Sequence, residues 1–224
     1  MTTILIAITV ACVAALSWLT YYFSSQAYTR KQTRRLNKAL TTTQAIFNAV
    51  DNVPNVLISR DLRRGLVLII NFYINELTEL NAKHPHLYYL QTRIQKLNQI
   101  PTGFERLRIR SKADRKRASS ALDTLANLIK QENQNQVIES KYADLARAAA
   151  SFAAQQIAVE TARQAAKDAE NVRAYGAALN FTYQAQALCR KLPPMMAEAL
   201  GESVAADVER LEGLTGRAPA SAQG

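Results

Sequence analysis

The chain has 224 residues, with 28 Lys and Arg against 18 Asp and Glu, and only 7 glycines and 2 cysteines. This glycine share is under half of the usual value of about 7%. It argues against β-sandwiches, barrels and nucleotide-binding α/β folds, because these use glycine at tight turns and phosphate loops. The net charge of +10 is uneven. Residues 1–117 hold 18 basic and 6 acidic side chains, whereas residues 118–224 hold 10 and 12.

The first segment with a strong signal is 3–23, TILIAITVACVAALSWLTYYF, which contains no charged side chain. As a helix rising about 1.5 Å per residue it would span roughly 30 Å, the thickness of the hydrocarbon core of a bilayer. Trp18, Tyr21 and Tyr22 lie at one end, and amphipathic rings favour the headgroup layer. The segment therefore predicts a single transmembrane helix, with the lipid bilayer as a partner.

Three alternatives compete with a permanent anchor. A cleaved signal peptide would need a basic start and a shorter apolar run. A lipoprotein signal ending at Cys12 would need a bulky aliphatic residue where Thr9 stands. A buried core helix would show a polar face to water. An anchor fits the segment better than any of them.

The orientation follows from the flanks. No acidic residue precedes Asp51, and five basic residues lie within about 15 residues of the anchor: Arg30, Lys31, Arg34, Arg35 and Lys38. Basic flanks are retained on the cytoplasmic side, so we expect the N-terminus outside and the C-terminal domain in the cytoplasm. These side chains would either attract anionic headgroups or only set the topology.

The predicted anchor also carries a strip of small residues. Ala7, Ala11 and Ala15 have small-xxx-small spacing, which lets helices approach closely in a membrane. Self-association or pairing with another membrane subunit is one interpretation. Chance is the other, because alanine is common.

The remainder of the chain is predicted to be helical throughout. Apolar residues recur at helical spacing between the prolines, and no stretch keeps the period of two that a strand needs. We therefore predict an all-α fold, with one N-terminal transmembrane helix followed by a cytoplasmic multi-helix bundle or helical-hairpin array. The expected divisions are an anchor at 1–23, a basic juxtamembrane helix at 24–53, a cytoplasmic helical domain at 54–212 and a disordered tail at 213–224.

Several helix boundaries can be predicted from local signals. Ser59 is a suitable N-cap, and Thr102 with Glu105 has the spacing of a capping box, so a helix should begin at each place. Breaks are expected in the polar stretch 131–136 and at 171–176.

The last helix should follow Pro194. The alanine-rich stretch before it has a heptad-like spacing that predicts the residues of its packing seam: Tyr142, Leu145, Ala149, Phe152 and Gln156.

A second basic cluster would be cationic on every side of a helix. It consists of Arg106, Arg108, Arg110, Lys112, Arg115, Lys116 and Arg117. We expect it to project as the exposed end of a long helix, because no face of it suits a core. It could be a solvated tip, contact an anionic protein surface or membrane, or bind nucleic acid. Nucleic acid is the least favoured, since only Phe104 lies nearby for base stacking.

No catalytic, cofactor or metal motif is recognisable in the sequence. His84 and His86 flank Pro85 as in a solvated turn, and Cys189 fits a small buried hydrophobe. Five acids fit a solvated face of the last helix: Glu198, Glu202, Asp207, Glu209 and Glu212. We expect no enzyme activity, no cofactor, no metal and no small-molecule substrate.

The leading hypothesis is a single-pass, membrane-anchored adaptor, scaffold or complex subunit. It would act through protein–protein contacts of its helical domain, with other subunits or by self-association. The alternative is a membrane tether that binds anionic lipid or nucleic acid through the basic clusters at 30–38 and 106–117.

Overall fold

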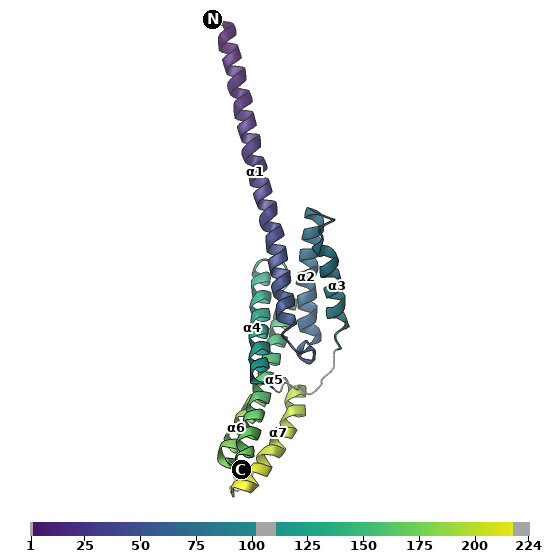
Figure 1. The fold of residues 1–224 in the computed structure, drawn as a ribbon, viewed down its shortest axis with the longest axis vertical. Helices are drawn as coiled ribbons and strands as arrows, with labels where there is room; N and C mark the ends of the chain where they lie inside the picture. Colours follow the sequence, from purple (N-terminus) through teal and green to yellow (C-terminus); the bar gives the residue numbers. More distant parts are fainter. Residues whose placement is uncertain (1, 102–110, 217–224) are drawn as a thin grey trace.

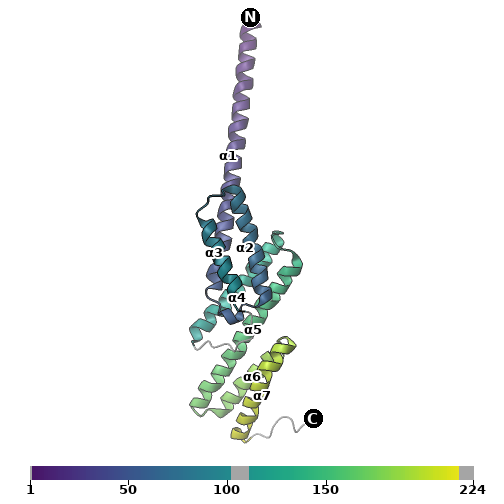
Figure 2. The same ribbon diagram turned by 90° about the vertical axis from the view of Figure 1, so that its right-hand side faces the viewer.

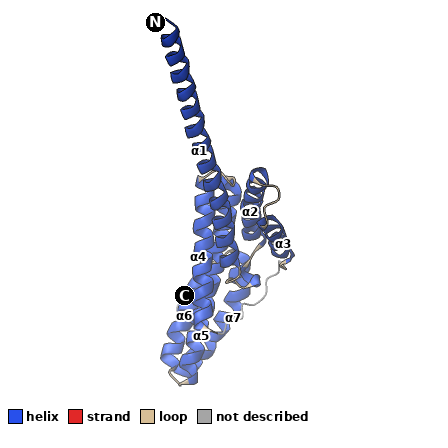
Figure 3. Ribbon diagram, turned by 45° about the horizontal axis from the view of Figure 1, so that its top comes forward, coloured by secondary structure: helices blue, strands red, loops and turns tan. Residues whose placement is uncertain are grey.

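The computed structural model describes the backbone of residues 2–101 and 111–216, and the side chains of these ranges except residues 2–15, 195, 196 and 199. Within these ranges the chain forms α-helices, one short 3₁₀ helix and turns, and no strand, as Figure 3 shows. The predicted all-α class is confirmed. The helices are α1 (Thr2–Val50), η1 (Asn55–Leu57), α2 (Arg60–Leu80), α3 (His86–Gln99), α4 (Lys112–Gln134), α5 (Ser140–Asn171), α6 (Tyr175–Cys189) and α7 (Pro194–Thr215).

Helix α1 is continuous over 49 residues. Figure 1 shows that its N-terminal part stands clear of the other helices and that its C-terminal part lies within the body. There it buries Ala39, Ile46 and Phe47 in the main core. No glycine or proline occurs before Pro54, so nothing in the sequence interrupts the helix.

Among the described residues, no helix has a stretch that is both long and apolar enough to cross a bilayer. The side chains of 3–15 in the expected anchor lie outside the described part of the chain. The transmembrane helix therefore gains no support here and stays a prediction.

The first of two helical bundles contains the end of α1, α2, α3, α4 and the first half of α5. Helix α2 is central, and its side chains at Leu62, Leu66, Ile69 and Leu77 are fully buried. Its start is the predicted one, because the Ser59 hydroxyl accepts a hydrogen bond from the Leu62 N–H at 3.3 Å. This cap satisfies one of the N–H groups that a helix leaves without an internal partner.

The packing seam predicted for the alanine-rich stretch is wrong in detail. Leu145 is 46% exposed, whereas Ala143, Ala146 and Ala150 are buried. Helix α5 approaches α2 at Gly65, where only short side chains fit. The smallest residues of α5 therefore face inward, although the larger ones have the more obvious heptad spacing.

The second bundle contains the other half of α5 with α6 and α7. Figure 2 shows α5 running from the first bundle into the second, so the two bundles share one helix of 32 residues. Both predicted breaks are confirmed, since α4 ends at Gln134 and α5 at Asn171.

The last helix begins at Pro194 as predicted, but it ends later than expected. It continues to Thr215, and Gly216 adopts the left-handed conformation (φ 67°) that often terminates helices. The expectation of disorder from residue 213 is therefore wrong for 213–215, and residues 217–224 lie outside the described ranges.

The predicted helix start at Thr102 and Glu105 also lies outside the described residues. The described part of this region begins with Ser111, whose hydroxyl accepts a hydrogen bond from the Ala113 N–H at 3.2 Å. Ser111 is therefore the N-cap of α4.

Candidate interaction surfaces

The aromatic end of the expected anchor is exposed on the projecting part of α1. Trp18 is 64% and Tyr21 73% exposed, and Tyr22 stacks on Trp18 with ring centroids 5.6 Å apart. The side chains of Ala7, Ala11 and Ala15 lie outside the described ones. This part of the molecule thus presents large apolar side chains that the rest of the described chain does not cover.

The structure divides the first basic cluster into two groups. Arg30, Lys31 and Arg34 are exposed on the projecting helix. Arg35 and Lys38 turn toward the body, where they form ion pairs with carboxylates of α2 and α4. The cluster at 30–38 therefore offers three of its five cations to an outside partner, and the other two attach α1 to its own domain.

Arg35 pairs with Glu76 of α2. Its Nε and Nη2 donate hydrogen bonds to the two carboxylate oxygens at 2.9 and 2.6 Å. These hydrogen bonds raise the pKa of the Arg35 guanidinium above its ordinary value. The two parallel bonds fix the rotation of α1 against α2.

Lys38 approaches a buried polar pair. Its Nζ lies 3.8 Å from the Glu132 carboxylate, which accepts a 2.7 Å hydrogen bond from the Tyr73 hydroxyl. Burial raises the pKa of Tyr73, and the hydrogen bond to Glu132 raises it further. This contact joins α1, α2 and α4. Lys38 belongs to the predicted basic cluster, but its partners Tyr73 and Glu132 could not be predicted, since nothing local marks Glu132 as buried.

The second basic cluster is only partly described, because Arg106, Arg108 and Arg110 lie outside the described residues. Lys112, Lys116 and Arg117 are exposed, as expected. Arg115 is buried, at 8% exposure, so the expectation that no cation of this cluster packs inward is wrong.

The burial of Arg115 follows from its position on α4. It precedes Ala118, Leu122 and Leu125, which form the buried face of this helix. The aliphatic part of an arginine can cover apolar surface, so a cation at the end of such a face can be accommodated.

An open groove lies between α1 and α4, with a volume of about 700 Å³. Three residues of α1, Ala45, Asn48 and Ala49, form one wall together with Asn52 of the turn that follows. Six residues of α4 form the other, namely Ala113, Lys116, Arg117, Ser120, Ala121 and Thr124. We call it the α1–α4 groove. The sequence gives no sign of it, because its walls are far apart in the chain.

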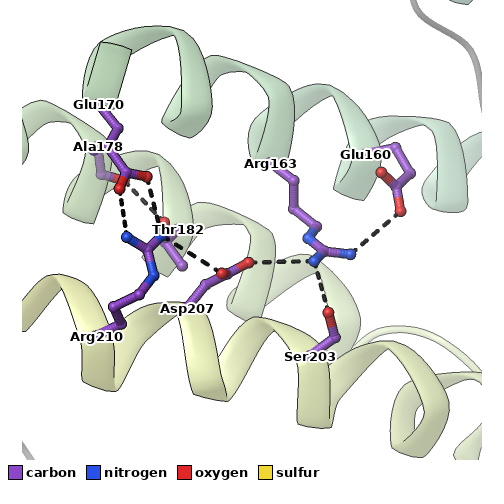
Figure 4. A network of polar contacts seen from close by, with 8 residues as sticks. All are labelled: Glu160, Arg163, Glu170, Ala178, Thr182, Ser203, Asp207 and Arg210. Carbon is purple, nitrogen blue, oxygen red and sulfur yellow. Dashed lines mark hydrogen bonds and ion pairs between the residues drawn. The ribbon is translucent and has the colours of Figure 1, made fainter. Parts of the chain in front are cut away.

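A polar network connects α5 with α7 (Figure 4). Arg163 of α5 is only 6% exposed, and its Nη2 donates to the Ser203 hydroxyl at 2.6 Å and to the Asp207 carboxylate at 3.2 Å. Farther along, Arg210 of α7 pairs with both carboxylate oxygens of Glu170. The hydrogen bonds from Arg210 lower the pKa of Glu170.

The acids of α7 do not all face solvent, contrary to expectation. Glu198, Glu202 and Glu209 are exposed as predicted. Glu212 is 3% exposed and accepts a 2.5 Å hydrogen bond from the Tyr183 hydroxyl, while Asp207 belongs to the network with Arg163. The sequence signal that could have indicated this is Arg163 itself, a cation within the alanine-rich packing stretch.

Cys189 is buried in the core of the second bundle, as predicted. Burial raises the pKa of its thiol, and nearby Arg163 acts in the opposite direction. His84 and His86 stack on each other at the α2–α3 turn, with ring centroids 5.5 Å apart. The structure therefore does not bring the cysteine and the histidines together.

Comparison of the chain with protein-family models, with curated proteins and with solved structures gives no match.

Proposed function

We propose that this chain is a single-pass membrane-anchored adaptor or complex subunit, with residues 3–23 in the bilayer and the helical domain in the cytoplasm. The supporting observation is the continuity of α1. One helix carries the exposed apolar side chains of Trp18 and Tyr21 at one end and buries Ile46 and Phe47 in the domain core at the other. A soluble monomer rarely leaves such apolar residues clustered in water.

The geometry of α1 also sets the position of the domain. The first residue of α1 that pairs with the body is Arg35, about 12 residues after Phe23. At about 1.5 Å per residue the domain would lie roughly 18 Å beyond the end of the proposed anchor. A rigid spacer of this kind suits a protein that presents a binding surface at a fixed distance from the membrane.

The alternative function is a tether for anionic lipid or nucleic acid. Exposed Arg30, Lys31 and Arg34 favour lipid contact beside the anchor, at about 1 kcal/mol each near an anionic surface. We treat this contact as an aid to anchoring, because the same residues would also fix the topology.

The described cations of the second basic cluster would lie too far away to act on the same bilayer. Lys116 and Arg117 share a groove with Asn48, about 25 residues after Phe23. This corresponds to roughly 38 Å along the helix, or about 29 Å if the helix tilts by 40°. The Debye length in physiological salt is about 8 Å, so these cations hardly attract the headgroups that surround the anchor. A partner in the cytoplasm fits their position better.

Membrane attachment and topology can be tested together. The full-length protein should float with vesicles and resist alkaline carbonate extraction, whereas a variant lacking residues 2–23 should not. In a background without Cys12 and Cys189, a cysteine in place of Thr33 should react with an impermeant maleimide only after the cells are permeabilised. Labelling of intact cells at this position, or a full-length protein that stays in the soluble fraction, would contradict the proposal.

The adaptor role needs a second measurement. Gentle detergent extraction of the full-length protein should recover other proteins at defined stoichiometry. A monomer without partners under these conditions would reject the subunit role even if the protein is anchored.

A further inference from the structure

We propose that the α1–α4 groove binds an amphipathic α-helix of a partner protein, with acidic side chains along one edge of that helix. This inference rests on the proposed adaptor function and names the surface and the kind of segment through which it works.

The floor of the groove suits apolar side chains of a helix. Ala45 and Ala49 on α1 face Ala113 and Ala121 on α4, and each of these side chains ends at its Cβ atom. The short side chains leave an open volume of about 700 Å³, within the usual range of ligand sites. A helix that lies in a groove inserts side chains spaced at i, i+3 or i+4, and i+7. The space between α1 and α4 can therefore receive a few such side chains.

The two walls differ in charge. The α4 wall carries Lys116 and Arg117, while the polar residues of the α1 wall, Asn48 and Asn52, are uncharged. Asp114 Oδ1 lies 3.6 Å from Arg117 Nη1, but both side chains are exposed, so the attraction between them is weak. A helix in the groove would therefore gain from acidic residues on the edge that faces α4 and from neutral polar residues on the other edge.

Asp51, which follows the end of α1, already forms an ion pair. Asp51 lines a smaller hollow next to the groove, together with Arg117. Its two carboxylate oxygens accept hydrogen bonds from Arg93 Nη2 at 2.6 and 2.7 Å. The charge of Asp51 is thus largely offset by Arg93, and the α4 wall keeps its positive potential.

A protein helix fits these features better than lipid or nucleic acid. The groove lies at the end of α1 remote from the expected anchor, far beyond the Debye length from the headgroups. None of its described lining residues is aromatic, so it provides no surface on which bases could stack. Its alanine floor offers nothing to a phosphate, whereas it complements the apolar face of a helix.

The proposal can be tested by photocross-linking in the full-length protein in its membrane. A p-benzoylphenylalanine in place of Thr124, inside the groove, is compared with one in place of Asn127, an exposed residue of the same helix that does not line it. We expect the probe at 124 to cross-link to one protein and the probe at 127 not to do so. Mass spectrometry should map the cross-link to a segment with helical apolar spacing and acidic residues along one edge.

Charge reversal provides a second arm. The variant K116E/R117E should lower the yield of the cross-link from residue 124 about tenfold. The matched control K130E/K141E reverses two exposed lysines outside the groove and should leave the yield unchanged. Circular dichroism of both variants checks that they fold.

Several outcomes would overturn the inference. These are cross-links to a second copy of this chain, to lipid or to nucleic acid, equal yields from both positions, and no product from residue 124. If other proteins still co-purify in any of these cases, the groove assignment fails and the adaptor function stands. If the protein is not membrane-bound or has no partner, the adaptor function itself fails.

Discussion

Gly65 of α2 faces Ala146 of α5 so closely that a Cβ atom added to the glycine would lie 2.5 Å from the Cβ of the alanine. Real Cβ contacts are essentially never this short, so a side chain at Gly65 would have to push the two helices apart. The other atoms near this position are at ordinary contact distances, at 3.7 Å and beyond. The absence of one methyl group therefore sets how closely α5 packs on the central helix.

We expect G65A to destabilise the protein by up to about 2 kcal/mol. Alanine is the better helix former by about 1 kcal/mol, but overpacking a core costs about 1–3 kcal/mol. The free energy of unfolding, measured by urea titration, gives the net result of these two opposing effects. The control is G201A on α7, where a new Cβ would meet nothing within 4 Å and the expected change is a slight gain.

A second substitution tests whether the contact with Ala146 causes the destabilisation by G65A. Adding A146G to G65A removes the atom that the new methyl group would meet, so the double variant should be more stable than the sum of the two single changes predicts. Additive effects would mean that the helices do not meet at these residues.

The buried pair of Tyr73 and Glu132 predicts a loss of stability at high pH. The pKa of Tyr73 is raised in the folded protein, so the unfolded chain, with a tyrosine pKa near 10, loses this proton first as the pH rises. The contribution is therefore fully present below about pH 10 and declines above it, by at most about 1.4 kcal/mol per pH unit. Denaturation between pH 8 and 11 should show a steeper loss of stability in the wild type than in Y73F, because the contribution of the buried Cys189 thiol is common to both.

Y73F should also lower the free energy of unfolding at neutral pH. Y73F leaves Glu132, which is almost fully buried, without its hydroxyl donor, and should cost about 1.5–3 kcal/mol. Y88F on the exposed start of α3 is the matched control and should change little. Equal effects of the two variants would contradict the role of the buried hydrogen bond.

The network around Arg163 should be sensitive to loss of its central cation. R163M keeps most of the side-chain volume but leaves Asp207 and Glu160 without the guanidinium that they share. Breaking a buried ion pair typically costs about 3–5 kcal/mol, and the partial exposure of both carboxylates lowers our expectation to about 2–3 kcal/mol. Thermal denaturation of R163M, D207N and the double variant gives the coupling energy, which should exceed about 0.5 kcal/mol. Independent effects would show that the two residues do not act together.

The contact between Glu170 and Arg210 predicts a small effect of acid. Because the pKa of Glu170 is lowered in the folded protein, its contribution is present above the ordinary glutamate range near pH 4.5 and is lost as the pH falls through the lowered value. Arg210 is about half exposed, so solvent screening limits the effect to less than about 1 kcal/mol. Between pH 6 and 3, E170Q should lose less stability than the wild type. E202Q, at an exposed residue of α7, should follow the wild type.

The sequence determined the helical class, the main breaks and the capped start of α2. Each of these rests on neighbours along the chain. The Ser59 hydroxyl caps a helix that starts one residue later, and the glycine- and proline-free stretch before Pro54 lets α1 continue without a break. The prediction of a transmembrane helix at 3–23 likewise rests only on the length and uncharged composition of that segment.

Only the tertiary structure decided which side of each helix faces inward and which polar groups meet. Leu145 is exposed and Ala146 buried because Gly65, far away in the chain, lets α2 come close to α5. Glu212 and Arg115 are buried because of where their helices dock, and the α1–α4 groove exists because two segments that are distant in the chain lie side by side with short side chains between them. Helical periodicity repeats at every turn and so leaves the rotation of a helix open, whereas contacts between distant residues select a single rotation.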